Sequence, residues 1–512
     1  MNFFLTTAID YTNGAPHIGH AYEKVLADAI ARYRRLKGDA VFFLTGVDQH
    51  GQKVQQSAQK QGVAPAEFVA GITSQFLSLW KTLDIRYDAW AATVDPVHKH
   101  CVQAMLQRLW ETGHFYKAKQ AGYYSVRQEQ FLTDKERGPD GEFGPEWGEV
   151  VLIEEENYFF KLAGHRQWLL DFIDARSAAG KPFVLPDFRV AELRNAVEKL
   201  SGDLCISRPK SRLEWGIELP FDKDFVTYVW FDALSNYVSF AGYDPTPGAD
   251  NAVFHSRWPA LHVIGKDILV PPHGIYWPIM LRACGFSDTE MPTLLVHGWW
   301  NIAGSKMSKS QGNIVDPAEL VKTFGVAATR YYLLSDIATG RDADFSEERL
   351  ILRYNTDLAN SLGNLLNRSL SMAKRYRGGA VKKSASPLAA FIAEKCAAYC
   401  RHMEAFEVHA AIESAWEIIG RCNGYVEETA PWKLAKDPAC AEKLDGVLYT
   451  LAEALRILSI LITPIIPESA EAIRSQLAWE GSVTLAQCEW GLLPDGHSLG
   501  DPVPVFPRIE SK

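Results

Sequence analysis

The stretch from Phe3 to Gly38 constrains the fold more than any other part of this chain. Phe3 to Ile9 is an apolar segment containing threonine, as expected for a buried strand. Asn13-Gly14 then marks a loop, and apolar residues recur at helical spacing from Ile18 until Gly38 ends the run. A strand, a tight loop and an amphipathic helix in this order are typical of the first unit of a parallel sheet.

The same alternation continues after Gly38. A second apolar strand ends with Gly46 and Asp48, helical patterns follow, and Ala89 to Thr93 reads as another strand. Repeated strand–helix alternation predicts a doubly wound parallel sheet, and such sheets bind ligands beyond the carboxyl ends of their strands. Residues 10–20 and Asp48 both fall at such ends.

The pattern changes several times along the chain and predicts five segments. Short, aromatic, alternating stretches begin at His114, the sheet resumes with FVTYVWFDALSNYVSF and LHVIGKDIL, and from Ser346 the chain is nearly all helical by period. We therefore expect an α/β fold with a Rossmann-like doubly wound parallel sheet, split by an inserted domain and followed by an α-helical bundle. The predicted segments are 1–113 (first half of the sheet domain), 114–223 (inserted domain), 224–298 (second half), 299–345 (a loop region) and 346–512 (the helical domain).

Length and composition set outer limits on the protein. A chain of 512 residues is too long for one ordinary core. No apolar run is long enough to span a membrane and no signal peptide is seen, so we expect a cytoplasmic protein without a membrane partner. The eight cysteines are scattered, as is typical of free thiols in a reducing compartment. The net charge of −9 excludes an overall basic surface but allows a local basic face.

Two short stretches far apart in the sequence carry groups suited to a phosphate. His17-Ile18-Gly19-His20 falls at the N-terminus of the first predicted helix, where free N–H groups favour an anion. Lys306-Met307-Ser308-Lys309-Ser310 places two ammonium groups among hydroxyls and glycines. Each stretch alone is more simply explained as a solvated or structural loop. Two histidines and two lysines converging on one triphosphate would stabilise the charge that develops as pyrophosphate leaves.

Together and in this order, the two stretches resemble the HIGH and KMSKS signatures of the class I aminoacyl-tRNA synthetases. The surrounding residues are similar to those of the methionyl-tRNA synthetases, and the resemblance covers essentially the whole chain. It implies activation of methionine with ATP to methionyl adenylate and pyrophosphate, and then transfer of methionine to the 3′ end of tRNA(Met). In this class the amino-acid carboxylate attacks the α-phosphate in line, so catalysis is mostly positioning and electrostatic stabilisation. Mg²⁺ accompanies the ATP.

The resemblance also assigns the ATP site. It implies catalytic contacts to the triphosphate by His17, His20, Lys306 and Lys309. It implies further ATP contacts by Gly19, Gly265 and Asp267. A helix cap is the alternative interpretation of Asp267. The sequence has no GxxxxGK[ST] pattern and no GxGxxG after the first strand, so a P-loop or a dinucleotide site is disfavoured.

A methionine site needs an apolar pocket for the thioether and a carboxylate for the ammonium group. By resemblance, the residues of this site are Ile9, Tyr11, Asp48, Arg208, Trp230, Ala233, Leu234, Tyr237, Ile268, His273 and Trp277. Asp48 would hold the amino group, and Arg208 would pair with a nearby carboxylate. Ordinary core packing is the alternative for most of the aromatic residues. The sequence departs from the family at two places: Asp10 stands where many members have proline, and the segment between Ile268 and His273 is one residue longer.

Many relatives carry zinc knuckles with CxxC pairs in the inserted domain. Here Ser125 and Gln128 stand where the first pair would be, and no CxxC follows, so four tetrahedral ligands cannot be assembled. We therefore predict no metal ligands and no structural zinc. Cys396 and Cys400 are one helical turn apart, as is typical of packed thiols.

The segment from Arg368 to Lys383 carries six basic residues and no acidic one, which predicts a local phosphate-binding face. By resemblance, Asn364 and Arg368 on one helix face and Trp432 in ETAPWKL read the tRNA anticodon, with Trp432 as a stacking platform. A core position between helices is the alternative for Trp432.

The predicted partners are L-methionine, tRNA(Met) and initiator tRNA. A monomer is expected, because the extra C-terminal dimerising module of some relatives is not seen. Two alternatives compete with this interpretation. One is a class I synthetase for another amino acid, which amino-acid-dependent pyrophosphate exchange would reveal. The other is a synthetase-like RNA-binding or regulatory protein without catalysis, which a charging assay would reveal.

Overall fold

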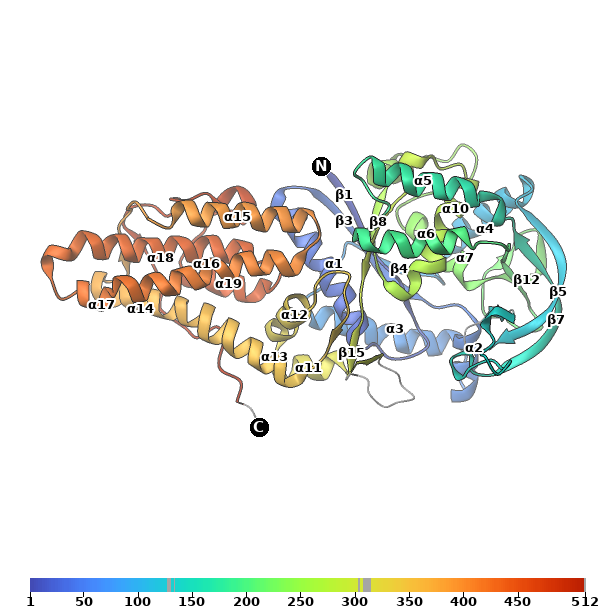
Figure 1. Ribbon diagram of the computed structural model, residues 1–512, viewed down its shortest axis with the longest axis horizontal. Helices are drawn as coiled ribbons and strands as arrows, with labels where there is room; N and C mark the ends of the chain where they lie inside the picture. The colour runs from blue at the N-terminus through green and yellow to red at the C-terminus, as the bar shows by residue number, and fades with distance from the viewer. Residues whose placement is uncertain (127–129, 133, 303, 307–314, 511–512) are drawn as a thin grey trace.

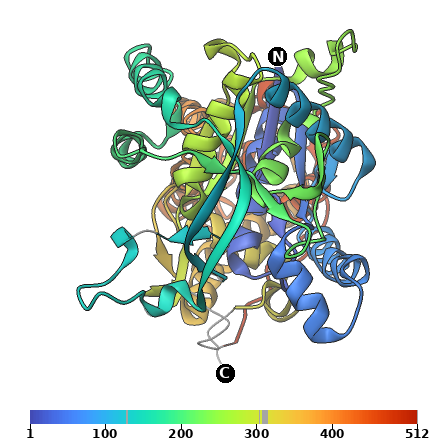
Figure 2. The same ribbon diagram turned by 90° about the vertical axis from the view of Figure 1, so that its right-hand side faces the viewer.

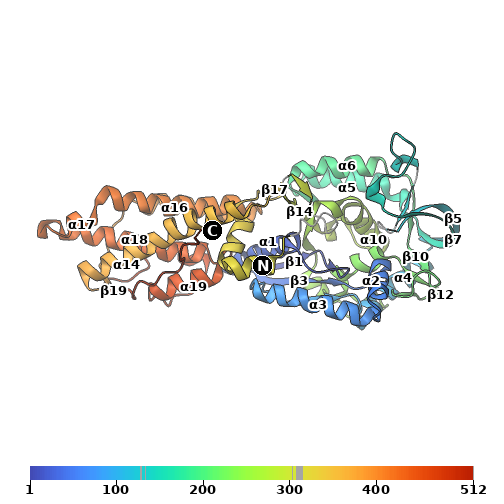
Figure 3. The same ribbon diagram turned by 90° about the horizontal axis from the view of Figure 1, so that it is seen from below.

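The computed structural model describes residues 1–126, 130–132, 134–302, 304–306 and 315–510. The molecule is elongated, with an α/β part at one end and a bundle of helices at the other, as Figures 1 and 3 show from two directions. The N-terminal helix α1 (Ile18–Lys37) lies where the two parts meet. Among the described residues, no helix is both long enough and apolar enough to cross a membrane.

A parallel sheet of seven strands forms the centre of the α/β part. The strand order is β2-β3-β1-β13-β14-β8, and β4 pairs with β3 outside this path. The strands are β1 (Asn2–Thr7), β2 (Asp10–Tyr11), β3 (Ala40–Asp48), β4 (Ala89–Ala92), β8 (Val184–Leu185), β13 (Ala260–Gly265) and β14 (Thr293–His297). The central strands are buried on both faces, as expected when helices cover both sides of a parallel sheet. The Rossmann-like fold is therefore confirmed.

Helices flank this sheet on both faces. They are α1, α3 (Pro65–Thr82), α4 (Pro96–Glu111), α7 (Val229–Leu234), α8 (Asn236–Ser239), α9 (Ala252–Arg257) and α10 (Trp277–Ala283). Helix α2 (Gln52–Gln61) packs against α3 in a small cluster of its own. Helix α1 packs against β1 and β3 on one side and against α12 (Val326–Ser335) and α16 (Val408–Thr429) on the other. This position between two layers explains why α1 is buried along nearly its whole length.

The inserted region is antiparallel. One sheet has the order β6-β5-β7-β9 and a second has the order β10-β12-β11. The strands are β5 (Phe115–Ser125), β6 (Gln130–Leu132), β7 (Val150–Phe160), β9 (Leu204–Cys205), β10 (Ser207–Pro209), β11 (Glu218–Leu219) and β12 (Asp222–Thr227). Strands β5 and β7 form the long twisted ribbon that faces the viewer in Figure 2. Two helices follow the ribbon, α5 (Arg166–Ala178) and α6 (Val190–Glu198).

Two expectations about this region were wrong. FVTYVWFDALSNYVSF does not return to the main sheet, because β12 pairs with β10 and β11 and the rest forms α7 and α8. Its apolar residues Phe231, Leu234 and Val238 are spaced as on a helix. The second wrong expectation concerns β8. This two-residue strand lies within the predicted insertion but joins the main sheet beside β14. A two-residue strand between prolines at 182 and 186 is too short to show the alternation of apolar and polar residues that identifies a strand.

The C-terminal part is helical, as predicted. Its helices are α13 (Glu347–Arg353), α14 (Asn364–Arg377), α15 (Ala389–Glu404), α16, α17 (Pro431–Leu434), α18 (Ala441–Leu461) and α19 (Pro467–Gln476). The single helix predicted from LRYNTDLANSLGNLLNRSLSMAKRYR runs as α13, a π-helical segment η9 (Tyr354–Gly363) and α14 without a break. Between the sheet and this bundle lie β15 (Trp300–Ile302), β16 (Ser305–Lys306), α11 (Pro317–Phe324) and α12.

Candidate active site

A cavity of about 770 Å³ lies at the carboxyl ends of β1, β3, β13 and β14. This is the edge of the sheet at which parallel α/β folds bind ligands. The cavity brings together most of the side chains predicted for the ATP and methionine sites. The predicted residues that line it are Ile9, Tyr11, His17, Gly19, His20, Asp48, Trp230, Ala233, Leu234, Tyr237, Gly265, Asp267, Ile268 and His273.

The two histidines at the start of α1 cap the helix with their own side chains. His17 is the N-cap residue, and its Nδ1 accepts a hydrogen bond of 3.1 Å from the Gly19 N–H. Nδ1 of His20 accepts another, also of 3.1 Å, from the His17 N–H. Since each Nδ1 is an acceptor, a neutral ring carries its proton on Nε2. Both rings therefore carry an Nε2–H donor, and both residues line the cavity.

Gly19 has a steric reason to be glycine. A Cβ added to it would lie 2.9 Å from the His17 ring, closer than real Cβ atoms approach. Any larger residue would displace the His17 ring and with it the hydrogen bond that caps α1. The glycine therefore keeps the first turn of α1 open while the two histidine rings lie 3.8 Å apart, centre to centre.

Gly265 and Asp267 follow directly from β13. Asp267 Oδ1 accepts a hydrogen bond of 3.2 Å from Trp299 Nε1. The short 3₁₀ turn here spans Lys266–Ile268 and has Gly265, not Asp267, at its N-cap position. The helix-cap interpretation of Asp267 is therefore wrong, and its carboxylate lines the cavity beside Gly265.

Of the KMSKS-like stretch, residues 306–310, the structure describes only Lys306. Lys306 lies in β16, which pairs with β15. Strand β15 begins at Trp300, and Trp299 and Trp300 line the cavity. Lys309 belongs to residues 307–314, which lie outside the described residues. At the first described residue after this gap, Val315, the backbone carbonyl accepts a hydrogen bond of 3.2 Å from the Ile18 N–H at the start of α1.

The apolar part of the cavity contains a pair of polar side chains. Tyr237 Oη and His273 Nε2 are 2.8 Å apart, and His273 Nδ1 lies 2.9 Å from the Ile268 carbonyl oxygen. Burial lowers the pKa of His273 to about 4, so its imidazole is neutral near pH 7. The Trp230 ring stands edge-on to His273 at 6.4 Å. A neutral, mostly apolar pocket of this kind suits a thioether side chain.

The segment between Ile268 and His273, one residue longer than in the family, leads into a kinked helical stretch. Residues Leu269–Tyr276 form a π-helical segment, η6, with a kink where the backbone of Val270 is non-helical. π-helical turns occur often at functional sites. His273 lines the cavity despite the longer segment.

Two of the residues predicted for the methionine site do not line the cavity. The Arg208 guanidinium is buried and lies 4.6 Å from the centre of the Tyr228 ring, and it is Tyr228 that lines the cavity. Trp277 is fully buried behind Tyr237, with its Nε1 donating to His262 Nε2 at 3.1 Å. In this structure both residues support the wall of the pocket from behind.

The structure also adds residues that sequence reasoning missed. Glu23 Oε2 lies 3.0 Å from His297 Nε2, and both residues line the cavity. Glu23 is three residues after His20 on the same helix, and His297 ends β14 as Asp48 ends β3, so both positions were open to inference. The other missed lining residues include Lys53, Tyr276 and Trp299 from the sheet domain, and Glu146 and Trp147 from the insertion.

Asp10, at the position where many family members have proline, forms a buried ion pair. Its Oδ1 accepts from Lys24 Nζ at 2.6 Å, and Lys24 also donates to Glu23 and to the Ala8 carbonyl. Burial raises the pKa of Asp10 to about 7 in spite of the lysine. The carboxylate that stands here in place of proline is therefore paired with a lysine on α1.

A buried cluster of one aspartate and two histidines lies behind the apolar part of the cavity. Asp232, on α7, is contacted by His50 Nδ1 at 2.7 Å and by His98 Nε2 at 2.8 Å. Burial alone would raise the pKa of Asp232, but the two imidazoles lower it to about 2. The backbone N–H of His50 also donates to Asp48 Oδ1 at 3.3 Å. The cluster therefore connects Asp48, at the end of β3, with α7, the helix that carries Trp230.

The proposed zinc-knuckle position is only partly visible. Ser125 Oγ donates to the Trp147 carbonyl at 2.5 Å, and Gln128 lies outside the described residues. Across the part of the chain that the structure describes, no group of three or more His, Cys, Asp or Glu side chains is arranged to hold a metal ion. The eight cysteines are free, and Cys396 is buried in α15.

The three predicted anticodon residues lie together in the helical domain. Asn364 and Arg368 are on α14, and the Arg368 guanidinium lies 5.7 Å from the centre of the Trp432 ring. Trp432 is 37% exposed, which contradicts the core interpretation. Acidic side chains from elsewhere in the chain partly neutralise the basic segment. The ion pairs are Arg368–Glu427, Lys374–Asp501 and Arg377–Asp445.

Comparison with known proteins gives consistent matches over the whole chain. Residues 3–140 and 148–370 match the family described as tRNA synthetases class I (M). Residues 376–512 match the anticodon binding domain of methionyl tRNA ligase. The methionine–tRNA ligase of Deinococcus radiodurans is 42% identical over 522 residues, which cover 100% of this chain and 75% of that protein. The methionine–tRNA ligase of Bacillus subtilis is 38% identical and is covered to 78%.

Solved structures show the same likeness. Mycobacterium tuberculosis methionyl-tRNA synthetase in complex with methionyl-adenylate superposes with a TM-score of 0.92 at 37% identity, covering 99% of this chain and 100% of that one. The apo form of the same enzyme gives a TM-score of 0.86. The cavity at the sheet edge, the matched signatures and these relatives lead to one conclusion: the chain belongs to the class I methionyl-tRNA synthetases, the methionine–tRNA ligases.

Proposed function

We propose that His17, His20, Lys306 and Lys309 contact the triphosphate of MgATP, with Gly19 allowing its close approach. The observation that carries this assignment is the capping arrangement at α1, which leaves both rings with Nε2–H donors at the edge of the cavity. These donors and the N-terminus of α1 would stabilise charge as pyrophosphate leaves. Gly265 and Asp267, at the end of β13, are suited to the ribose and adenosine.

The apolar half of the same cavity is proposed to hold methionine. Asp48 is only 5% exposed and lines the cavity, so it is suited to the ammonium group. The remaining contacts are proposed for Ile9, Tyr11, Trp230, Ala233, Leu234, Tyr237, Ile268 and His273. Arg208 and Trp277 are proposed to act from behind this wall. The carboxylate of methionine would then face the α-phosphate for in-line attack, and no protein nucleophile is required.

Pyrophosphate exchange tests this assignment. The exchange rate should depend on methionine and should hardly respond to isoleucine, valine or cysteine. The pocket rejects shorter and branched side chains by packing, where one methylene is worth about 1–3 kcal/mol. The measurement is amino-acid-dependent exchange with the purified protein. Equal rates with isoleucine and methionine would rule out the proposed pocket.

We also propose that the protein functions without structural zinc. Ser125 occupies a position where related proteins carry a cysteine ligand, and its hydroxyl is bonded to the Trp147 carbonyl. The purified protein should contain less than stoichiometric zinc and should keep its activity in a chelator when Mg²⁺ is in excess. Elemental analysis is the measurement, and one zinc per chain would contradict the proposal.

At the other end of the molecule, Asn364, Arg368 and Trp432 are proposed to read the anticodon of tRNA(Met) and of initiator tRNA. The exposure of Asn364 and Trp432 and the contact of the Arg368 guanidinium with the Trp432 ring support this role. The protein is proposed to act as a cytoplasmic monomer. The five segments 1–113, 114–223, 224–298, 299–345 and 346–512 are proposed as its functional division, although β8 of the second segment joins the main sheet and β12, at the start of the third, pairs within the inserted region.

A further inference from the structure

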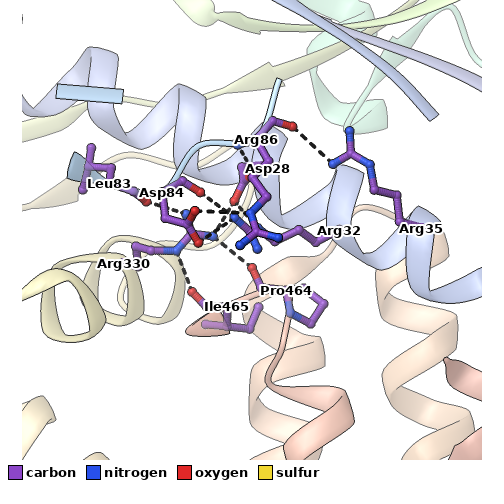
Figure 4. Close-up of polar contacts among 9 residues, drawn as sticks. All are labelled: Asp28, Arg32, Arg35, Leu83, Asp84, Arg86, Arg330, Pro464 and Ile465. Carbon is purple, nitrogen blue, oxygen red and sulfur yellow. Dashed lines mark hydrogen bonds and ion pairs between the residues drawn. The ribbon is translucent and has the colours of Figure 1, made fainter. Parts of the chain in front are cut away.

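The sheet domain and the helical domain are joined by a buried arginine. Arg330, on α12, is fully buried and makes four hydrogen bonds in three directions (Figure 4). Its Nη2 donates to Asp28 Oδ2 on α1 at 2.7 Å, and its Nη1 donates to the Leu83 carbonyl at 2.9 Å. Its Nε and Nη2 donate to the carbonyls of Ile465 and Pro464 at 2.9 and 3.1 Å. One guanidinium thus connects the sheet domain with the helical domain.

Asp28 is equally buried and is held from three sides. Besides Arg330, it accepts from Arg32 Nε at 2.7 Å and from the Arg86 backbone N–H at 2.9 Å. Arg32 in turn pairs with Asp84 at 2.9 Å. Two arginines and two aspartates therefore neutralise each other, with Asp28 and Arg330 fully buried and Asp84 at the edge, where its side chain is 39% exposed. We name Asp28, Arg32, Asp84 and Arg330 the joint cluster.

The joint cluster connects the two elements that matter for tRNA charging. Asp28 belongs to α1, the helix that presents His17 and His20 to the cavity. Pro464 and Ile465 follow α18, which runs back along the bundle from the region of α17, where Trp432 lies (Figure 1). At 1.5 Å per residue, the 21 residues of α18 give a lever of about 30 Å between the joint and that region. A tilt of a few degrees at the joint would move the far end by about 2 Å.

A buried ionic cluster is a weak source of stability but a strong geometric restraint. The desolvation of such groups offsets most of their attraction, and apolar replacements of the same volume are often equally stable. A guanidinium bound to one carboxylate and to three carbonyls in fixed directions, by contrast, permits one arrangement of the domains. Apolar packing of α1 against α12 and α16 holds the two parts together, and the other ion pairs across the interface are more exposed, such as Lys37 with Glu404 at 2.7 Å, and contribute little.

We propose that Arg330 is a positioning residue for aminoacylation: through the joint cluster it fixes the distance between the anticodon surface and the adenylate, so that a tRNA bound at its anticodon delivers its 3′ end to the cavity. The tRNA spans both sites as one body. A displacement of about 1 Å at reacting atoms can cost about 100-fold in rate. The proposal rests on the anticodon-binding role of the helical domain and does not depend on which side chains contact the anticodon.

The test compares two tRNAs and three proteins. Charging of tRNA(Met) and of the same tRNA with a changed anticodon is measured for the wild type, for Arg330→Lys and for Lys37→Ala. A lysine retains the charge but cannot bond Asp28 and the three carbonyls at once. Lys37→Ala removes a half-exposed ion pair from the same interface and is the matched control.

Arg330→Lys should lower kcat for the cognate tRNA by about tenfold or more, and should change kcat for the anticodon variant by less than about threefold, because that tRNA does not use the anticodon surface. Methionine-dependent pyrophosphate exchange without tRNA should stay within about twofold of the wild type. Lys37→Ala should match the wild type in every assay.

An equal loss with both tRNAs, or a loss of exchange in parallel with charging, would overturn the proposal. Either one is what a general loss of stability would produce. If the wild type does not discriminate between the two tRNAs, both the anticodon role and the proposal for Arg330 are overturned. If Arg330→Lys discriminates between the two tRNAs as strongly as the wild type, only the proposal for Arg330 is overturned. If Arg330→Lys melts below the assay temperature, Asp28→Asn carries the same test, because it keeps the side-chain shape and weakens the same cluster.

Discussion

His20→Ala is expected to slow methionyl-adenylate formation by about 100- to 1,000-fold, while the KM for methionine changes little. The substitution removes an Nε2–H donor from the N-terminus of α1, which is proposed to stabilise the charge that develops as pyrophosphate leaves, and losses of this size follow removal of single oxyanion donors. Single-turnover adenylate formation and exchange kinetics measure the two effects separately. Lys309→Ala should produce a loss of the same order on the same proposal.

The cap at α1 requires a control, because His20 also accepts a hydrogen bond from the His17 N–H. His20→Glu keeps an acceptor at this third helical position, where glutamate is the usual partner in a capping box. It should therefore retain the melting temperature of the wild type. Its carboxylate cannot donate to phosphate and repels it, so adenylate formation should be at least as slow as in His20→Ala. Recovery of the wild-type rate in His20→Glu would show that the histidine acts only as a helix cap.

Trp432→Ala is expected to lower the charging efficiency at low tRNA concentration by roughly 10- to 100-fold. Stacking of one base on an aromatic side chain is worth about 1–3 kcal/mol, and about 1.4 kcal/mol corresponds to a factor of ten. Exchange without tRNA should stay near wild type, since Trp432 lies at the end of the helical domain remote from the cavity (Figure 3). The measurement is kcat/KM for tRNA(Met) beside exchange on the same preparation.

Trp432→Phe is the matched control for this residue. Phenylalanine keeps an aromatic face for stacking and for the contact with Arg368, so it should retain most of the charging efficiency. The melting temperature should change little in either variant, because the side chain is 37% exposed. A large fall in melting temperature with Trp432→Ala, with charging restored by cooling, would show that the residue acts in packing.

The central fold could be predicted because its elements carry strong local signals. The strand before Asn13-Gly14, the helix from Ile18 to Gly38 and the strand ending at Asp48 each have a clear period and a clear end. β8 could not be predicted, because it consists of two residues whose partner, β14, lies more than a hundred residues further along the chain. The helices α7 and α8 were missed because an aromatic, β-branched stretch favours a strand by composition while its spacing is helical.

The site residues divide in the same way. Those in a contiguous motif, such as His17 and His20, could be assigned to the cavity before the fold was known. Glu23 and His297 could not be paired from sequence, because a contact over 274 positions depends on how α1 crosses β14. Arg208 and Trp277 were assigned to the methionine site by resemblance, but they lie behind the wall of the cavity. Resemblance identifies residues near a site, and only the structure shows whether they line it or support it from behind.

The order of strands in the main sheet has a consequence for synthesis of the protein on the ribosome. β1 is made first and lies in the middle of the sheet, between β3 and β13. Its pairing with β3 can form early, but β13 begins only at Ala260. At about 5–20 residues per second, one edge of β1 waits roughly 10–50 s for its partner. An apolar strand with an open edge is a template for wrong pairing between chains, so nascent chains that have not yet reached Gly265, the end of β13, should depend most on chaperones.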